Sequence, residues 1–258
     1  MEQWLSIWSI GQDATLNDLN IIKEAGFNGV EIWTEHIRSN EYLDYAKQTG
    51  LQMGLHLPFH DLNLGSPDPI VFERTLSVLN EWIEKLSKYG GHHATFHGGY
   101  AWASEEREET LVRVKERIKT LSEKAKENGI DLLLENLIPD RLNYCHHIAS
   151  NVEEWFDLIH ETKVKACLDI GHLAVMGNDT EEVITKLGSS LGAVHFSDND
   201  RHSDLHLLPG EGADISKGAV EFLEKVGFNG PIVYEINPYK YTLQDIVKHI
   251  TSVKEAVK

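Results

Sequence analysis

The chain has 258 residues, of which 41% are hydrophobic and 25% charged, and its formal net charge is −17 at pH 7. This length and composition are typical of one globular domain with a sizeable core, here expected to span residues 1–258. The acidic balance disfavours nucleic acid and anionic membranes as partners. No signal peptide or long apolar run is evident, and the two cysteines lack metal-ligand spacing, so we expect a cytoplasmic protein without a membrane partner.

Short apolar runs recur along the chain, each followed by a turn and then by a longer segment with helical periodicity. We predict strands at 4–10, 29–33, 52–58, 92–98, 130–137, 165–171, 192–198 and 230–237. Helices are predicted at 71–90, 106–129, 180–191, 214–227 and 242–257. Ser150 and Glu153 have capping-box spacing, which predicts that a further helix starts there.

Eight such units average about 32 residues, the size of a βα repeat. Strands that alternate with helices form parallel sheets, and near-continuous apolar runs indicate a sheet that is covered on both faces. The sequence therefore predicts an α/β fold, a single (β/α)8 TIM barrel, with an open doubly wound sheet as the alternative. No G-x-G-x-x-G follows any predicted strand, so we expect no nucleotide cofactor.

Ionisable residues stand at the carboxyl ends of six consecutive predicted strands. Strands three to eight carry there, in order, His56, His97, Glu135, Asp169, His195 and Glu235. His172 follows one helical turn after Asp169, and Asp204 and His206 lie in the loop after the seventh strand. A barrel brings the carboxyl ends of its strands together, and the active sites of such barrels lie on that face.

The four residues on strands five to eight indicate a metal site. Glu135, Asp169 and Glu235 would place three carboxylates beside His195, and acids held so close repel one another and resist ionisation. A divalent cation removes that repulsion, and this ligand set suits Mn²⁺, Mg²⁺, Co²⁺ or Zn²⁺. We therefore predict that these four residues bind one divalent metal ion.

Several motifs along the chain carry a family resemblance. They are LHLPFHDLNLGSPDP (55–69), TFHGG (95–99), LLLEN (132–136), CLDIGH (167–172), VHFSDND (194–200), DLHLLPGEG (204–212) and VYEIN (233–237). The chain resembles, over nearly its whole length, the xylose isomerase-like TIM barrel superfamily, which holds sugar and sugar phosphate isomerases and epimerases and the related endonuclease IV family. In the epimerase branch a Glu, an Asp, a His and a Glu hold the metal, and these match Glu135, Asp169, His195 and Glu235. The resemblance implies that Glu135 and Glu235 are also the catalytic acid and base.

The endonuclease IV branch, whose members are apurinic/apyrimidinic endonucleases, binds three zinc ions through nine ligands. A residue of suitable type stands at each position, namely His56, His97, Glu135, Asp169, His172, His195, Asp204, His206 and Glu235. After LEN that branch has a small Gly-rich turn, whereas this chain has LIPDRLNY (137–144), and its loops offer few basic residues to hold a DNA backbone. A trinuclear zinc endonuclease therefore stays as the alternative, and the metal count separates the two.

The resemblance implies a metal-dependent isomerase or epimerase that acts on a small sugar, sugar phosphate or polyol ketone. One glutamate would remove a proton next to the carbonyl and the other would return it, through an enediolate that the metal stabilises. The expected substrate-binding residues are His56, His97, His172, His206, Trp33 and Arg201. Dehydration of a polyol or keto acid at the same single-metal site is a third possibility. Dimers and tetramers are common in the family, so the resemblance also allows a homo-oligomer.

Overall fold

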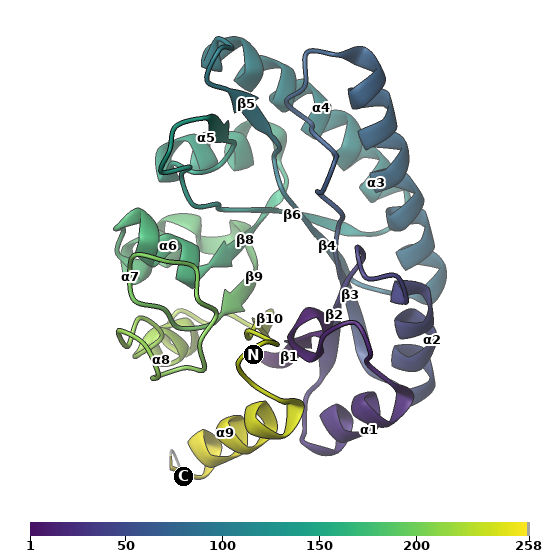
Figure 1. Cartoon of the computed structure of the whole chain (residues 1–258), viewed down its shortest axis with the longest axis vertical. Helices are drawn as coiled ribbons and strands as arrows, with labels where there is room; N and C mark the ends of the chain where they lie inside the picture. Colours follow the sequence, from purple (N-terminus) through teal and green to yellow (C-terminus); the bar gives the residue numbers. More distant parts are fainter. Residues whose placement is uncertain (257–258) are drawn as a thin grey trace.

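The computed structural model describes residues 1–256, with residues 251–256 described by their backbone alone. Its main strands are β1 (Glu2–Ser6), β2 (Gly29–Trp33), β3 (Gln52–His56), β4 (His93–Phe96), β6 (Asp131–Glu135), β8 (Lys165–Asp169), β9 (Leu191–Phe196) and β10 (Pro231–Tyr234). Within the described range these eight strands close into a parallel barrel in the order β1–β10–β9–β8–β6–β4–β3–β2 (Figure 1). The predicted (β/α)8 TIM barrel is confirmed, and each barrel strand overlaps a predicted one.

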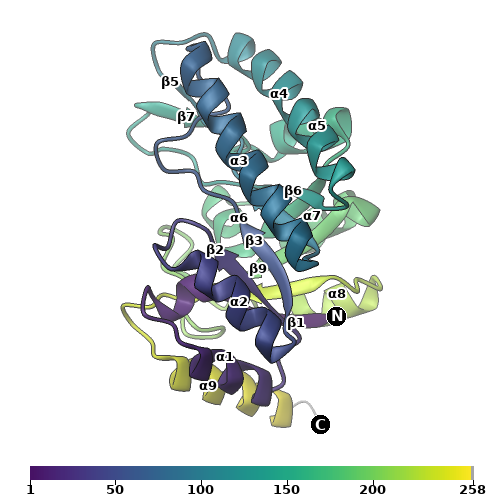
Figure 2. The same ribbon diagram turned by 90° about the vertical axis from the view of Figure 1, so that its right-hand side faces the viewer.

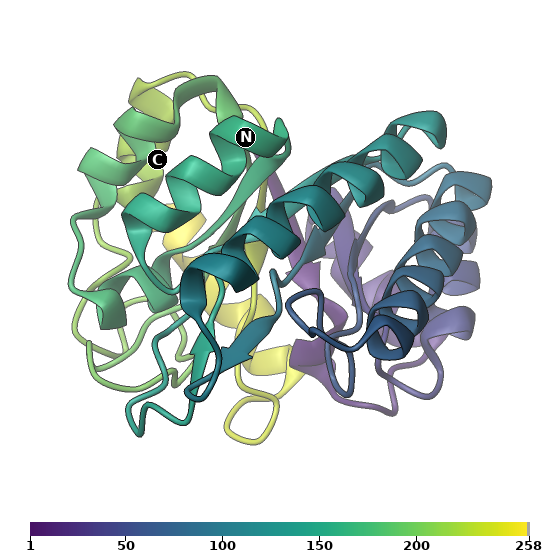
Figure 3. The same cartoon turned by 90° about the horizontal axis from the view of Figure 1, so that it is seen from above.

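Helices surround the strands when the molecule is seen from above (Figure 3). They are α1 (Leu16–Glu24), α2 (Ser39–Thr49), α3 (Pro69–Tyr89), α4 (Arg107–Glu127), α5 (Val152–Thr162), α6 (Ile170–Met176), α7 (Thr180–Leu187), α8 (Ala219–Lys225) and α9 (Leu243–Ala256). Trp155 of α5 is fully buried, and its Nε1 donates to the Leu134 carbonyl oxygen at 3.0 Å. This contact fixes α5 on the strand that ends in Glu135.

Alternation along the strands determines which side chains enter the barrel. Leu133, Cys167 and Ala193 form a small buried apolar cluster of their own, separate from the large core between strands and helices. Glu135, Asp169 and His195 follow them two residues later on β6, β8 and β9, and residues two apart on a strand share a face. The three ionisable side chains therefore form the next layer inside the barrel, toward the carboxyl ends of the strands.

The limits of α3 show how local chemistry ends these helices. The Asp68 side chain accepts a hydrogen bond from the Ile70 backbone N–H at 2.8 Å, and Pro69 is the first helical residue. Both are typical of helix starts. Gly90 adopts a left-handed φ of 78° just after the helix, as the sequence predicts for a glycine that ends one.

The first predicted strand, 4–10, is wrong at its carboxyl end. β1 stops at Ser6, and Ile7–Ile10 forms a 3-10 turn. The Ser9 hydroxyl accepts from the Ile236 backbone N–H at 2.7 Å, so this turn is fixed across the end of β10. The turn brings Trp8 to the open end of the barrel, where it lines a cavity.

Other predicted helix limits also need correction. The Ser150 hydroxyl donates to the His147 carbonyl oxygen at 2.6 Å and so does not cap α5. Asn151 is the cap instead, because its side chain accepts from the Glu154 N–H at 3.1 Å. The helices predicted at 180–191 and 214–227 shorten to α7 and α8 because glycines adopt positive φ beside them, Gly188 after α7 and Gly218 before α8. The last residue of the helix predicted at 242–257 lies outside the described residues.

A second, two-stranded sheet was not predicted. β5 (Tyr100–Trp102) and β7 (Cys145–His147) pair antiparallel, and Figure 2 shows them beside the first turn of α3. Helix N-termini follow the carboxyl ends of barrel strands. This small sheet therefore lies on the same face of the barrel as Glu135, Asp169 and His195.

Among the described residues, no helix is long and apolar enough to cross a membrane. The single-domain boundary 1–258 stays a prediction.

Candidate active site

The structure brings the predicted acids and histidines together at the carboxyl end of the barrel. Glu135, Asp169, His195 and Glu235 each offer one ligand atom, and these atoms lie within 4.8 Å of one another. Glu135, Asp169 and His195 are buried, and the side chain of Glu235 is 12% exposed. Two further groups, His56–His97–Glu135 and His172–Asp204–His206, meet the same distance limit, so Glu135 belongs to two groups at once.

Glu135, Asp169, His195 and Glu235, here called the central group, include acceptor atoms that receive no hydrogen bond. Asp169 Oδ1 accepts from the His172 backbone N–H at 2.6 Å, but its Oδ2 is buried without a hydrogen bond. His195 Nδ1 is likewise buried without one and lies 3.1 Å from Glu235 Oε2 and 3.4 Å from Glu135 Oε1. Buried polar atoms normally have partners, so these atoms point to a ligand that the protein itself does not supply.

Glu31 decides which nitrogen of His195 faces this group. The Glu31 side chain is fully buried on β2, and its Oε1 accepts from His195 Nε2 at 2.9 Å. The same carboxylate accepts from His93 Nε2 at 2.9 Å and from the Thr95 hydroxyl at 3.0 Å. In the neutral ring the proton of His195 is then on Nε2, which leaves the electron pair of Nδ1 for a metal ion. A carboxylate behind a histidine ligand is a common device for fixing its tautomer.

Burial alone would raise the pKa of Glu31, but His195 and His93 outweigh it and lower that pKa far below its ordinary value. Glu31 is therefore ionised and accepts from both rings. Glu31 is not among the site residues predicted from the sequence. The available signal was a single acid in the middle of the apolar strand GVEIW, a position where an unpaired charge is costly. His93, which donates to Glu31 at 2.9 Å, has a structural role.

Replacing Glu31 with Gln is expected to weaken Mn²⁺ binding by about 10- to 100-fold, the usual cost of losing a partner that orients a metal ligand. The amide keeps the volume of the carboxylate but no longer requires a proton on His195 Nε2. Titration calorimetry of metal-free protein measures the change. Glu2→Gln is the matched control, because Glu2 starts the neighbouring strand β1, four residues before its carboxyl end. An unchanged affinity in the folded Glu31 variant contradicts the assignment.

The second group pairs two histidines with Glu135. His56 Nε2 and His97 Nε2 lie 3.2 Å and 3.1 Å from the same atom, Glu135 Oε2. His56 Nδ1 donates to the Leu57 carbonyl oxygen at 3.1 Å, which in the neutral ring leaves Nε2 as an acceptor aimed at a carboxylate. Two acceptors facing each other favour a cation between them.

The third group has the same design. His172 Nδ1 donates to the Asn136 carbonyl oxygen at 2.8 Å, and His206 Nδ1 donates to the Glu235 carbonyl oxygen at 3.0 Å. Their Nε2 atoms lie 3.2 Å and 3.1 Å from Asp204 Oδ2. His206 has a left-handed φ of 47°, a costly conformation for a residue with a side chain and one that is concentrated at functional sites.

The charges in this layer shift one another strongly. Burial would raise the pKa of Glu135, but His195, His56 and His97 lower it well below its usual value. Burial lowers the pKa of His56, yet its bond to Glu135 outweighs that effect and raises the pKa to about 9. Burial, with Glu135 and Asp204 nearby, raises the pKa of Asp169. Such closely spaced carboxylates need protons or a cation between them, and a metal ion would supply that positive charge.

The residues therefore fit a divalent metal ion. Carboxylate oxygens and imidazole nitrogens are the ligands that Mn²⁺, Co²⁺ and Zn²⁺ take in proteins. Asn136 supports this arrangement, because its side chain accepts from the Asp169 N–H at 2.8 Å and donates to the Asp169 carbonyl oxygen at 2.9 Å. This is the asparagine of the LLLEN motif, and it holds β8 beside the end of β6.

A cavity of about 230 Å³ opens above this layer, with Glu135, Glu235, His56, His97, His172 and His206 in its lining. Trp33 and Trp8 also line it, with their rings 5.8 Å apart, and Trp8 lies 4.9 Å from the ring of His206. Five of the six predicted substrate-binding residues therefore border one cavity. Arg201 does not, since it is exposed at a loop position with a φ of 65°.

Residues 19–255 match the family described as xylose isomerase-like TIM barrel. Among curated proteins, the chain is 26% identical over 257 residues to the uncharacterized protein MJ1311 of Methanocaldococcus jannaschii, covering 94% of this chain and 85% of that protein. It is 25% identical over 230 residues to the D-psicose 3-epimerase of Ruminiclostridium cellulolyticum, covering 83% of this chain and 75% of that enzyme.

A solved structure titled D-tagatose 3-epimerase-like protein aligns with a TM-score of 0.84 and 25% identity, over 100% of this chain and 97% of that one. The fold, the motifs and the shared length agree with the resemblance inferred from the sequence. The chain belongs to the xylose isomerase-like TIM barrel family.

Proposed function

We propose that this protein is a divalent-metal-dependent epimerase or isomerase of a ketose that acts at the carbon next to the carbonyl. The observation that carries the proposal is the placement of Glu135 and Glu235, which border one cavity and lie 3.4 Å and 3.1 Å from His195 Nδ1. The similarity to a psicose 3-epimerase supports this reaction class. Glu135, Asp169, His195 and Glu235 would hold the metal ion.

The two glutamates reach the substrate from different directions. Glu135 ends β6, and Glu235 follows β10, which is separated from β6 by β8 and β9 in the barrel. One carboxylate removes a proton from the carbon next to the carbonyl, and the other returns a proton on the opposite side. When bound, the metal ion supplies Lewis-acid stabilisation of the negative charge that develops on the substrate oxygens. His97 and His172 border the same cavity and hydrogen-bond substrate hydroxyls, while Trp33 limits access of water.

The test is hydrogen exchange coupled to epimerisation. Metal-free protein is reloaded with Mn²⁺ and incubated with D-psicose or D-fructose in D₂O. We expect each ketose to yield its C3 epimer with deuterium at C3, and we expect no reaction after chelation. If no ketose exchanges hydrogen in the presence of Mn²⁺, Co²⁺, Mg²⁺ or Zn²⁺, the proposed reaction is wrong.

A second candidate is a phosphodiesterase with three metal ions, as in the endonuclease IV branch. The specific observation in its favour is that three groups of ligand atoms, rather than one, meet within a few ångströms. Elemental analysis of protein purified without chelator separates the two. About one ion per chain supports the epimerase, whereas about three zinc ions per chain, with cleavage of abasic-site DNA, support the nuclease. The net charge of −17 favours the epimerase, and so does the lack of lysine or arginine among the described residues that line the active-site cavity.

A further inference from the structure

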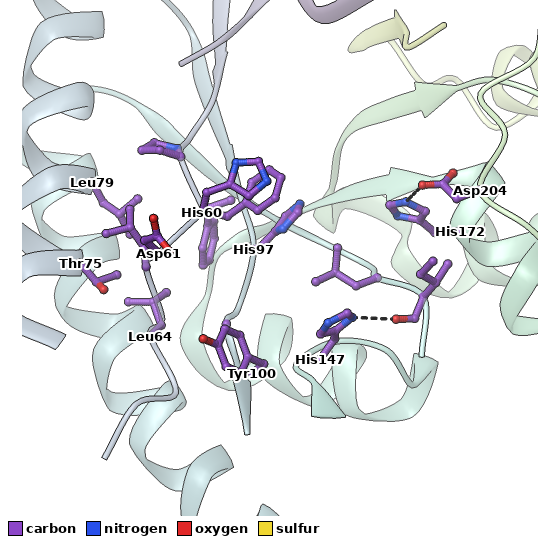
Figure 4. A pocket seen from close by; sticks show the side chains of 17 residues that line it. His60, Asp61, Leu64, Thr75, Leu79, His97, Tyr100, His147, His172 and Asp204 are labelled. Atoms are coloured by element: carbon purple, nitrogen blue, oxygen red, sulfur yellow. Dashed lines mark hydrogen bonds and ion pairs between the residues drawn. The ribbon is translucent and has the colours of Figure 1, made fainter. Parts of the chain in front are cut away.

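A second, larger cavity lies beside the active-site cavity. Its volume is about 450 Å³, and it shares Phe59, His60, His97, His172 and Asp204 with the smaller one. Figure 4 shows His97 between the two sides of this space, with His172 and Asp204 on one side and Leu64, Thr75 and Leu79 on the other. A ligand held at the metal ligands can therefore extend into this second space.

The wall of the larger cavity is mainly apolar. The side chains that give it this character are Phe59, Leu62, Leu64, Leu79, Leu137 and Ile138. Two of its polar side chains already have partners in the protein. The Thr75 hydroxyl donates to the Val71 carbonyl oxygen at 2.8 Å, and His147 Nδ1 donates to the Ile138 carbonyl oxygen at 3.1 Å. Apolar groups are thus the chemistry that this wall stabilises best.

Among the residues that the structure describes, neither lysine nor arginine lines the larger cavity. Two arginines reach the neighbouring loop, but they are used to hold its backbone. Arg117 Nη1 donates to the Leu64 and Ser66 carbonyl oxygens at 2.6 Å each, and Arg113 Nε donates to the Gly65 carbonyl oxygen at 3.4 Å. Phosphate and carboxylate groups are normally recognised by such cations. An anionic group in this cavity would instead meet the carboxylates of Asp61 and Asp204.

The wall is also fixed in place before any ligand binds. Asn63 Nδ2 donates to the Tyr100 carbonyl oxygen at 2.9 Å, and Asn63 Oδ1 accepts from the Tyr100 N–H at 2.9 Å. A Cβ on Gly65 would lie 2.5 Å from the Tyr100 carbonyl oxygen, so only glycine permits this close approach. The loop after β3 and the strand β5 therefore form one rigid wall, and a preformed wall reduces the entropic cost of binding.

We propose that the larger cavity is a subsite for an apolar, uncharged substituent on the ketose, and that the protein selects substituted ketoses over free or phosphorylated ones. This inference rests on the proposed function, because the reacting end of the ligand is assigned to the smaller cavity. The expected substrate is a ketose that carries an alkyl or aryl group at one end. A sugar phosphate would find neither lysine nor arginine among the described residues of this wall.

Calorimetric titration of the Mn²⁺-loaded protein tests the proposal with four ligands: the benzyl ethers of D-fructose at C1 and at C6, D-fructose, and D-fructose 6-phosphate. We expect one of the two ethers to bind at least about tenfold more tightly than either of the other sugars, because its ring leaves water for an apolar wall. Tightest binding of the phosphate, equal binding of all four, or no binding of either ether overturns the proposal.

A substitution in the wall connects this preference to the cavity. Ile138 is half-buried beside the space, and Ile138→Trp fills part of it, so the preference for the benzyl ether should disappear. Val112→Trp is the matched control, since Val112 is 64% exposed on α4 and does not line the cavity. The control should keep the wild-type preference. A preference that survives in the Ile138 variant places the ether elsewhere and contradicts the assignment.

The two proposals fail in different ways. If the ether binds most tightly but none of the sugars exchanges hydrogen at C3, the subsite stands and the epimerase proposal is wrong. If the ketoses are epimerised and the phosphate is preferred, the epimerase stands and the subsite is wrong.

Discussion

Replacing Glu135 with Gln is expected to lower kcat for ketose epimerisation by about 10⁴-fold, the upper range for loss of a general acid or base. The amide cannot accept the substrate proton, and it presents no negative charge to the groups around it. Glu135 is close to four predicted ligands. Its oxygens lie 3.2 Å from His56 Nε2, 3.1 Å from His97 Nε2, 3.5 Å from His172 Nδ1 and 3.4 Å from His195 Nδ1. Initial rates at saturating Mn²⁺ measure the effect.

The Glu2→Gln variant again serves as a control, because Glu2 contacts Trp4 and Gln52 and belongs to none of the ligand groups. It should retain the wild-type kcat. Circular dichroism and the melting temperature establish that the Glu135 variant is folded. Wild-type turnover by a folded Glu135→Gln protein would remove Glu135 from the catalytic assignment.

Replacing Asp169 with Ala is expected to abolish stable metal binding. Asp169 Oδ2 is buried in the central group without a donor, and it is therefore a free ligand atom. A metal present at about 100 times its Kd stabilises the folded state by about 2.7 kcal/mol. The melting temperature of the wild type should accordingly rise when Mn²⁺ is added, whereas that of the variant should not.

Asp169 also caps α6, since its Oδ1 accepts from the His172 N–H, and loss of a cap costs about 1 kcal/mol by itself. Asp169→Asn separates the two roles. The asparagine can still accept the capping hydrogen bond, so the metal-free protein should melt close to the wild type, yet its neutral side chain should bind Mn²⁺ more weakly. If Mn²⁺ raises the melting temperature of both variants as much as that of the wild type, Asp169 is not a ligand.

Much of the fold could be predicted because its signals are local. Each barrel strand is a short apolar run, and residues such as Gly90 mark helix ends through their own backbone preferences. Two of the errors arose where contacts with a distant segment decide the path of the chain. Ser9 is held by the N–H of Ile236, far away in sequence, and this turns 7–10 out of the predicted strand. The pairing of β5 with β7 is equally non-local, and both strands are too short to give a pattern.

The candidate site likewise has features that the sequence predicts and features that depend on tertiary structure. The sequence by itself determined which acids and histidines stand at strand ends, because parallel strands in a barrel must bring those ends together. Only the tertiary structure decided how they are grouped, with Glu135 shared by two groups. It also decided which nitrogen of His195 faces the other predicted ligands, because Glu31 reaches that ring from β2 across the interior of the barrel. Such a contact depends on the closure of the barrel, which no local pattern of residues records.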